Sequence, residues 1–281
     1  MKDQDSPSVR FFPGVILHLG TLLNGGRGKG GGKRPGNFNA YAAGTASVIL
    51  RKHPSAGLSL RVHRRTLPLR KGLSSSAAVC VATARGFNRL NRLGMTLRQE
   101  MEAAYRGELL TGSHCGRMDQ ACAWGGGPVL LSFSGDIMET DELTPGGDFH
   151  LLIVDLGGKK DTKRILRDLN ASFAGGDPGL RRALGEENLR IVTSARTMLE
   201  RGNPRGLGSL MNEAQEIFDA LVTPRCPGEL RAPILHGVLE KGRGTGLVWG
   251  GKGVGSQGDG TAQFLCRGEG ERGGPSQDHG G

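Results

Sequence analysis

One short segment of the sequence is suited to binding phosphate. Residues 68–77 read Pro-Leu-Arg-Lys-Gly-Leu-Ser-Ser-Ser-Ala, and the apolar spacing from Ser75 to Leu93 is typical of a helix. Backbone N–H groups at a helix N-terminus have no partner within the helix, and the helix dipole favours negative charge there. A glycine followed by three serines at this position predicts an anion site. An ordinary serine N-cap would fit the segment alone equally well.

Two carboxylates downstream of this segment could complete a metal site. Glu108 lies near the end of a predicted helix, and Asp119 lies in the segment Cys-Gly-Arg-Met-Asp-Gln at residues 115–120. One carboxylate could hold Mg²⁺ while the other faces a substrate hydroxyl. Taken alone, two acids at this separation are more often solvated surface groups.

A glycine-rich run near the C-terminus is the third candidate. Gly253, Gly255 and Gly258 match the pattern Gly-x-Gly-x-x-Gly, but the residues at 261–265 are typical of a strand. A dinucleotide-binding site requires a helix at that point and an acid about 20 residues further on. We therefore reject a dinucleotide site and predict a turn at 250–260 that lets the backbone approach a bound ligand.

The elements that must position these residues follow from the hydrophobic periodicity. Thr96 and Gln99 form a capping box that opens the helix carrying Glu108. The predicted helices are 40–50, 75–93, 96–110, 163–170, 180–200 and 207–221, and the predicted strands are 57–63, 128–133, 149–155 and two short strands within 244–266.

Composition shifts divide the chain into four segments. Residues 1–36 contain a Gly/Arg/Lys-rich tract and are predicted to be irregular, and residues 267–281 form a polar, glycine-rich tail that we predict to be disordered. Between them we predict an N-terminal domain at 37–140 and a C-terminal domain at 141–266, with the boundary in 134–148.

Charge and composition narrow the function classes. The formal net charge is +10, and residues 6–99 contain sixteen Lys or Arg but no Asp or Glu, which suits an anionic ligand such as a nucleotide or a nucleic acid. Two Trp, two Tyr and nine Phe without aromatic–basic interleaving argue against nucleic acid, so none is expected as a partner.

No apolar run reaches about 18 residues, so no membrane span is expected. Five scattered cysteines predict a reducing compartment, and we expect a cytoplasmic protein, with organelle import left open.

Together these segments resemble the GHMP kinases, the superfamily of galactokinase, homoserine kinase, mevalonate kinase and phosphomevalonate kinase. Residues 68–78 match the family's phosphate-loop motif, Pro-x3-Gly-Leu-(Gly/Ser)-Ser-Ser-Ala, and residues 115–120 are similar to the galactokinase-type Cys-Gly-x-Met-Asp-Gln. The run at 250–260 resembles the family's C-terminal glycine-rich motif. The family's N-terminal motif, near Gly-Arg-x-(Asn/Gly)-Leu-x-Gly-(Glu/Asn), is not found in 1–36, so we expect an incomplete N-terminus.

The resemblance implies an α+β, two-domain fold. Its N-terminal domain would be like the second domain of a small-subunit ribosomal protein, and its C-terminal domain would be ferredoxin-like. The implied activity is transfer of the γ-phosphoryl group of ATP to a hydroxyl of a small molecule, most closely a monosaccharide as in the sugar 1-kinases.

The resemblance also implies roles for individual residues. Asp119 would accept or orient the proton of the attacking hydroxyl, and Ser76 and Glu108 would coordinate Mg²⁺. Gly255 and Ser256 would close over the substrate and nucleotide. The ATP phosphates would be bound by the backbone of Gly72, Leu73, Ser74, Ser75, Ser76 and Ala77.

Two other readings remain open at this point. Because the N-terminal motif is absent, the chain could be a kinase-like paralogue that binds a ligand without catalysis. The sixteen uncompensated basic residues in 6–99 motivate a nucleic-acid binder as a third, weaker reading.

Overall fold

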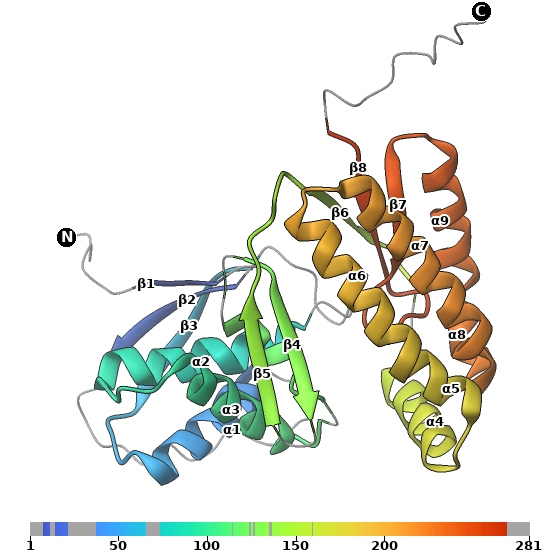
Figure 1. The fold of residues 1–281 in the computed structure, drawn as a ribbon. Coiled ribbons are helices and arrows are strands. Elements are labelled where there is room, and N and C mark those ends of the chain that lie inside the picture. Colours follow the sequence, from blue (N-terminus) through green and yellow to red (C-terminus); the bar gives the residue numbers. More distant parts are fainter. Residues whose placement is uncertain are drawn as a thin grey trace, which may run out of the picture. The chain divides into compact units, whose positions relative to one another are not determined.

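The chain folds into two compact units, Met1–Glu142 and Leu143–Gly281, shown in the ribbon of Figure 1. The computed structural model describes residues 8–11, 15–21, 38–65, 74–113, 115–123, 125, 127–134, 137–158 and 160–268. No helix among them is long and apolar enough to cross a membrane.

The first unit contains a small antiparallel sheet and a separate hairpin. The sheet has the order β1-β2-β3 and consists of β1 (Ser8–Phe11), β2 (Val15–Thr21) and β3 (Leu58–Arg65); the hairpin consists of β4 (Val129–Ser134) and β5 (Ile137–Glu142). Our prediction that residues 1–36 are irregular is wrong for β1 and β2. The apolar residues from Val15 to Leu19, two of them β-branched, favour a strand once β3 is available as a partner.

Three helices and a short 3₁₀ helix complete the first unit. They are α1 (Phe38–Lys52), α2 (Ser75–Asn91), α3 (Leu97–Leu109) and the 3₁₀ helix η1 (Asp119–Ala123). Every residue of α2 from Ala77 to Ala84 is buried, and most of these side chains are small, so neighbouring elements approach this helix closely.

Two glycines set how closely α1 and α3 cross. A Cβ atom on Gly44 would lie only 2.3 Å from the carbonyl oxygen of Gly107, and one on Gly107 would lie 2.4 Å from the Cα of Thr45. The two backbones are therefore in direct contact, which only residues without a Cβ permit. This contact fixes the last turn of α3, where Glu108 lies.

The predicted capping box at the start of α3 is confirmed. The Gln99 N–H donates to the Thr96 hydroxyl at 3.3 Å, and the Thr96 N–H donates to the Gln99 side-chain carbonyl at 2.8 Å. Both otherwise unpaired donors at this helix end are thus satisfied.

The second unit combines a three-stranded antiparallel sheet with several helices (Figure 1). The sheet order is β6-β8-β7, and one face is covered by α9 through Leu235, Leu239 and Phe264. The strands are β6 (His150–Asp155), β7 (Val248–Gly253) and β8 (Thr261–Cys266); the helices are α4 (Thr162–Ala174), α5 (Pro178–Arg182), α6 (Asn188–Glu200), α7 (Pro204–Leu221), α8 (Pro227–Leu230) and α9 (Pro233–Gly244).

One edge of this sheet is apolar and open. Among the described residues β6 pairs only with β8, so its outer edge has no neighbouring strand. Leu151, Leu152 and Ile153 are 62%, 48% and 42% exposed, on both faces of the strand.

The region predicted as one helix at 180–200 is more complex. It consists of α5, a π-helical turn (Ala183–Glu187) and α6. Glu187 at the end of the turn pairs with Arg182 at 2.6 Å and with Arg190 at 3.1 Å, which ties the two α-helical segments together.

Candidate functional site

The predicted phosphate loop leads into the N-terminus of α2. Gly72 and Leu73 lie outside the described residues. Ser74 adopts a left-handed conformation (φ 51°, ψ 36°), and its side chain does not cap the helix. The first intrahelical bond runs from the Ala78 N–H to the Ser74 carbonyl at 3.0 Å. The N–H groups of the preceding residues of this turn therefore have no acceptor within the helix, as an anion site requires.

Ser76, Glu108 and Asp119 meet close to this helix terminus. The Ser76 side chain, in the first turn of α2, lies near the Glu108 carboxylate, in the last turn of α3, and acts to lower the pKa of that carboxyl. Asp119 is the first residue of η1, and its negative charge acts on Glu108. Three elements separated in sequence thus bring together the three side chains predicted for metal binding and proton transfer.

The environment of Glu108 is unfavourable to its charge. Only 2% of the residue is exposed, and this burial raises its pKa above the ordinary value. The side chains of Ser76, Gln120 and Ser113 oppose the rise in pKa, whereas the Asp119 carboxylate adds to it. The result is a buried carboxylate beside a second one.

Gln120 is a polar neighbour of Glu108 to which the sequence analysis assigned no role. It is fully buried, and its Nε2 donates to Glu108 Oε2 at 2.9 Å. Its Oε1 is also buried and has no hydrogen-bond partner among the described residues. The motif at 115–120 signalled this position, but nothing in it pointed to a contact with Glu108.

A buried ion pair holds η1 in place. Arg85 on α2 pairs with Glu100 on α3 at 2.7 Å, and its guanidinium also donates to the carbonyl of Ala123, the last residue of η1. Asn88 donates to Glu100 at 2.8 Å. This hydrogen-bond network connects α2, α3 and η1. It therefore holds Glu108, on α3, and Asp119, on η1, in fixed positions relative to each other.

The surroundings of the nearby Cys115 disfavour its thiolate form. Burial raises the pKa of its thiol, and the carboxylates of Glu108 and Asp119 raise it further. Reactive cysteines need an electropositive environment. Cys115 therefore contributes a neutral side chain to the cluster.

The glycine-rich turn lies in the second unit, between β7 and β8. Gly255 has φ 62°, and Gln257 has φ 60°, a left-handed conformation that is uncommon for a non-glycine residue. Gln215 on α7 holds this turn: its Nε2 donates to Gln257 Oε1 at 2.9 Å, and its Oε1 accepts from the Gly253 N–H at 2.8 Å. The Ser256 hydroxyl is buried and has no partner among the described residues.

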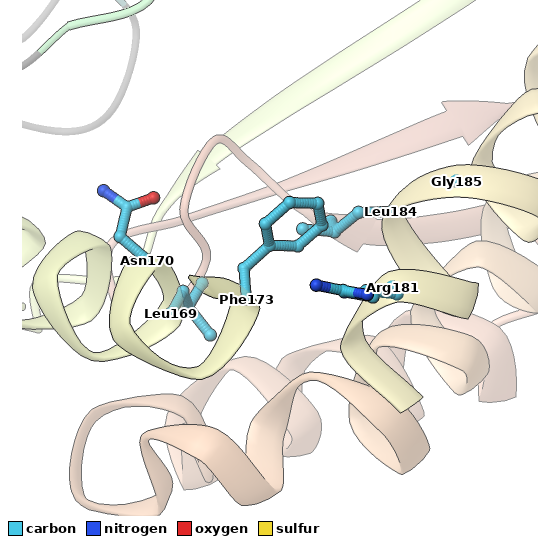
Figure 2. A pocket seen from close by; sticks show the side chains of 6 residues that line it. All are labelled: Leu169, Asn170, Phe173, Arg181, Leu184 and Gly185. Atoms are coloured by element: carbon cyan, nitrogen blue, oxygen red, sulfur yellow. The ribbon is translucent and has the colours of Figure 1, made fainter. Parts of the chain in front are cut away.

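The second unit also has a pocket, shown in Figure 2, that carries no evident chemistry. Its volume is about 630 Å³. The Arg181 guanidinium lies against the Phe173 ring, 5.7 Å from its centroid, and Leu184 lies nearby. The pocket is lined by Leu169, Asn170, Phe173, Arg181, Leu184 and Gly185 and by none of the predicted site residues. An apolar pocket without convergent titratable groups is a weaker candidate than the Glu108 cluster.

One known protein family matches part of the first unit. Residues 40–127 match the family described as GHMP kinases N terminal domain, a range that contains Ser76, Glu108 and Asp119. Over these residues the chain is similar to the N-terminal domain of the GHMP kinases. Comparison with curated protein sequences gives no significant match.

Solved GHMP kinase structures share the fold of both units at low sequence identity. L. major mevalonate kinase in complex with R-mevalonate is 19% identical, with a TM-score of 0.70, covering 92% of this chain and 79% of that one. Lactococcus lactis galactokinase complexed with galactose is 16% identical, with a TM-score of 0.72 and coverage of 91% and 78%. Cytophaga hutchinsonii homoserine kinase is 19% identical, with a TM-score of 0.62 and coverage of 91% and 76%. The predicted GHMP kinase fold is confirmed.

The residues of this cluster in the first unit fit a divalent cation. Glu108 and Ser76 offer the oxygen ligands that Mg²⁺ prefers. None of the ion pairs among the described residues includes Glu108 or Asp119, and the Asp119 charge disfavours a second negative charge on Glu108. The unpartnered Oε1 of Gln120 adds a buried acceptor at the same place.

Proposed function

We propose that this chain is an ATP-dependent kinase that transfers a phosphoryl group to a hydroxyl of a small molecule, and that the acceptor is a monosaccharide. The observation that carries the proposal is the meeting of Ser76, Glu108 and Asp119 beside the N-terminus of α2. Phosphoryl transfer requires mainly positioning and compensation of charge, and these groups are of the right kind for both.

Each part of the cluster has a role in this proposal. The backbone N–H groups from Gly72 to Ala77 bind phosphate oxygens, because the N–H groups in the first turn of α2 have no acceptor within the helix and the helix dipole favours an anion there. The Ser76 hydroxyl and the Glu108 carboxylate hold Mg²⁺, which when bound offsets the charge of the phosphates. Asp119 orients the acceptor hydroxyl and takes its proton.

The glycine-rich turn of the second unit is a further proposed ligand contact. Gly255 and Ser256 contact the nucleotide or the substrate, and the buried, unpartnered Ser256 hydroxyl provides a polar group for that contact. The Gln215 hydrogen bonds give the turn a fixed backbone, which limits the entropy lost on binding.

The choice of a sugar as acceptor rests on the segment at 115–120, which is similar to the galactokinase type. The structural neighbours act on different alcohols: one holds R-mevalonate, another galactose, and a third is a homoserine kinase. An acceptor panel of monosaccharides, mevalonate and homoserine therefore distinguishes the sugar proposal from the wider kinase proposal.

A reducing location is part of the proposal. Cys80, Cys115, Cys226 and Cys266 are free thiols. Free and partly buried thiols suit a cytoplasmic enzyme better than an oxidising compartment.

The proposal is tested by Asp119→Asn, assayed for ATP consumption over the acceptor panel. We expect kcat to fall by about 10²–10⁴-fold because proton transfer loses its acceptor, while ATP affinity measured by calorimetry stays within about twofold. Asp148→Asn, at an exposed position of the second unit, is the matched control and should keep full activity. Unchanged turnover in Asp119→Asn contradicts the assigned mechanism.

A catalytically inactive, ligand-binding paralogue is the second candidate. The absence of the family's N-terminal motif from residues 1–36 favours it. ATP binding by the unaltered chain without phosphoryl transfer to any acceptor would support this candidate over the kinase.

A further inference from the structure

We propose that Gln120 is a positioning residue for the divalent cation: its Nε2 orients the Glu108 carboxylate, and its Oε1 accepts a hydrogen bond from a water molecule bound to that cation. This inference rests on the proposed function, because it assumes that Glu108 and Ser76 hold a divalent cation.

The first step is the geometry of the side chain. Gln120 is fully buried, and one amide hydrogen is committed to Glu108 Oε2 at 2.9 Å. The amide therefore lies against the carboxylate that the proposal assigns to the cation. Fixing one carboxylate oxygen leaves Glu108 Oε1 in a defined direction.

The second step is the unpartnered acceptor. Gln120 Oε1 is buried without a hydrogen-bond partner among the described residues, and a buried polar atom without a partner is unfavourable. Exchanging the amide N and O would not resolve this, because Oε1 would then face the Glu108 carboxylate, acceptor against acceptor. The orientation found is thus the favourable one, and it leaves an acceptor free next to the cluster.

The third step identifies the missing donor. Mg²⁺ keeps several waters when it binds to proteins. A cation held by Glu108 and Ser76 would bring such waters to the cluster, and a metal-bound water is a strong hydrogen-bond donor. The frame of Arg85, Glu100 and Ala123 holds η1, so Gln120 is kept in place to receive that hydrogen bond.

The experiment uses Mn²⁺ as the probe and the full chain, with and without ATP. Free Mn²⁺ is measured by electron paramagnetic resonance for the unaltered chain and for Gln120→Met, which preserves size but removes both the donor and the acceptor. We expect the Mn²⁺ Kd to rise by about 10–100-fold. Circular dichroism checks folding, and Gln120→Asn, whose shorter amide cannot reach Glu108, replaces Gln120→Met if that variant does not fold.

Two further measurements separate this role from a merely structural one. Thr83→Val removes a comparably buried hydrogen bond within α2, from the Thr83 hydroxyl to the Val79 carbonyl at 2.8 Å, and should leave Mn²⁺ affinity unchanged. At saturating Mn²⁺, the water-proton relaxation enhancement should differ between Gln120→Met and the unaltered chain, because the bound water has lost its acceptor.

The outcomes distinguish this inference from the proposed function. If the unaltered chain binds Mn²⁺ and Gln120→Met binds it equally well, the role of Gln120 is overturned and the kinase proposal stands. If the unaltered chain binds no Mn²⁺ at millimolar concentration, with or without ATP, both are overturned.

Discussion

Two buried glutamines, Gln215 in the second unit and Gln120 in the first, differ in how many hydrogen bonds their side-chain amides make. Gln215 donates to Asp219 and to Gln257, both at 2.9 Å, and accepts from the Gly253 N–H at 2.8 Å. Gln120 donates to Glu108 but leaves its own oxygen without a partner among the described residues. A buried side chain whose hydrogen bonds are all made within the protein has a structural role. A buried polar atom without a partner indicates that its partner comes from a bound ligand, ion or water.

The same contrast extends to the surroundings of the two side chains. The Gln215 network joins α7, α9 and the glycine-rich turn, since Asp219 also bonds His236 at 2.9 Å. Gln120 instead contacts a carboxylate that has a second carboxylate, Asp119, beside it. Among the described residues, the buried glutamine of the first unit therefore keeps an acceptor without a partner, whereas the buried glutamine of the second unit holds a pre-formed turn.

The sharpest test of this contrast is Glu108→Gln. We expect activity at limiting Mg²⁺ to fall by about 100-fold or more, because the proposed Mg²⁺ ligand is lost. We also expect no loss of thermal stability at neutral pH, because burial and Asp119 raise the pKa of Glu108 and so disfavour its charged form in the folded chain. A coupled ATP assay and a thermal melt measure the two effects.

Glu102→Gln on the same helix is the control for this prediction. Glu102 pairs with Arg106 at 2.5 Å near the surface. Its removal should change activity by no more than about twofold. A strongly destabilised Glu108→Gln would show that Glu108 is a structural residue, and the contrast between the units would then fail.

The second largest expected effect is a loss of stability when Gln215, the buried glutamine of the second unit, is replaced. Gln215→Met leaves the Gly253 N–H, Gln257 and one Asp219 oxygen without their partner, and we expect it to cost about 2–4 kcal/mol of unfolding free energy. Gln120→Met removes one hydrogen bond and one unpaired acceptor together, so its cost should be about half of that or less. Urea denaturation of both variants gives the comparison, and equal losses would contradict it.

The smallest expected effect is a pH dependence confined to the second unit. Burial alone would lower the pKa of His236, but hydrogen bonds to Asp219 and to the Ala232 carbonyl outweigh it and raise the pKa. The stabilisation is therefore complete below the unfolded pKa of about 6.5 and is lost as the pH rises through the higher folded value. Both side chains are partly exposed, at 40% and 31%, so the change should stay under about 1 kcal/mol.

Urea midpoints between about pH 5.5 and 8.5 measure this effect, and His236→Gln should flatten the curve. A rise in stability with pH in the unaltered chain, absent from His236→Gln, would reverse the assigned sign.

Local signals in the sequence predicted much of the fold. The Thr96–Gln99 capping box and the helix that it opens follow from residue spacing, as does the start of α2 at Ser75. These features depend on contacts within a few residues, which a sequence pattern expresses directly.

Elements that depend on distant partners were missed. Helix α9 contains three glycines, which lowers its intrinsic propensity, and it forms because Leu235 and Leu239 are buried and Asp259 accepts from the Leu235 N–H at 2.8 Å. Strand β5 is largely polar, so its pairing with β4 was not visible in the periodicity.

The candidate site shows the same limit. The family resemblance implied Ser76, Glu108 and Asp119 as a group, but the contact of Gln120 with Glu108 joins residues on different elements. The close crossing of α1 and α3 at Gly44 and Gly107, next to the buried Glu108, is likewise not encoded in any local pattern. Burial and pairing of this kind are tertiary properties.

The open edge of β6 affects how this protein behaves in concentrated solution. Leu151, Leu152 and Ile153 stand exposed on a strand whose backbone can still form a ladder with another chain. Natural proteins usually blunt such edges with lysine, proline or a bulge, and none of these interrupts residues 150–155. Precipitation during purification would therefore begin at this strand, through intermolecular sheet growth, and dilution rather than added salt is the remedy.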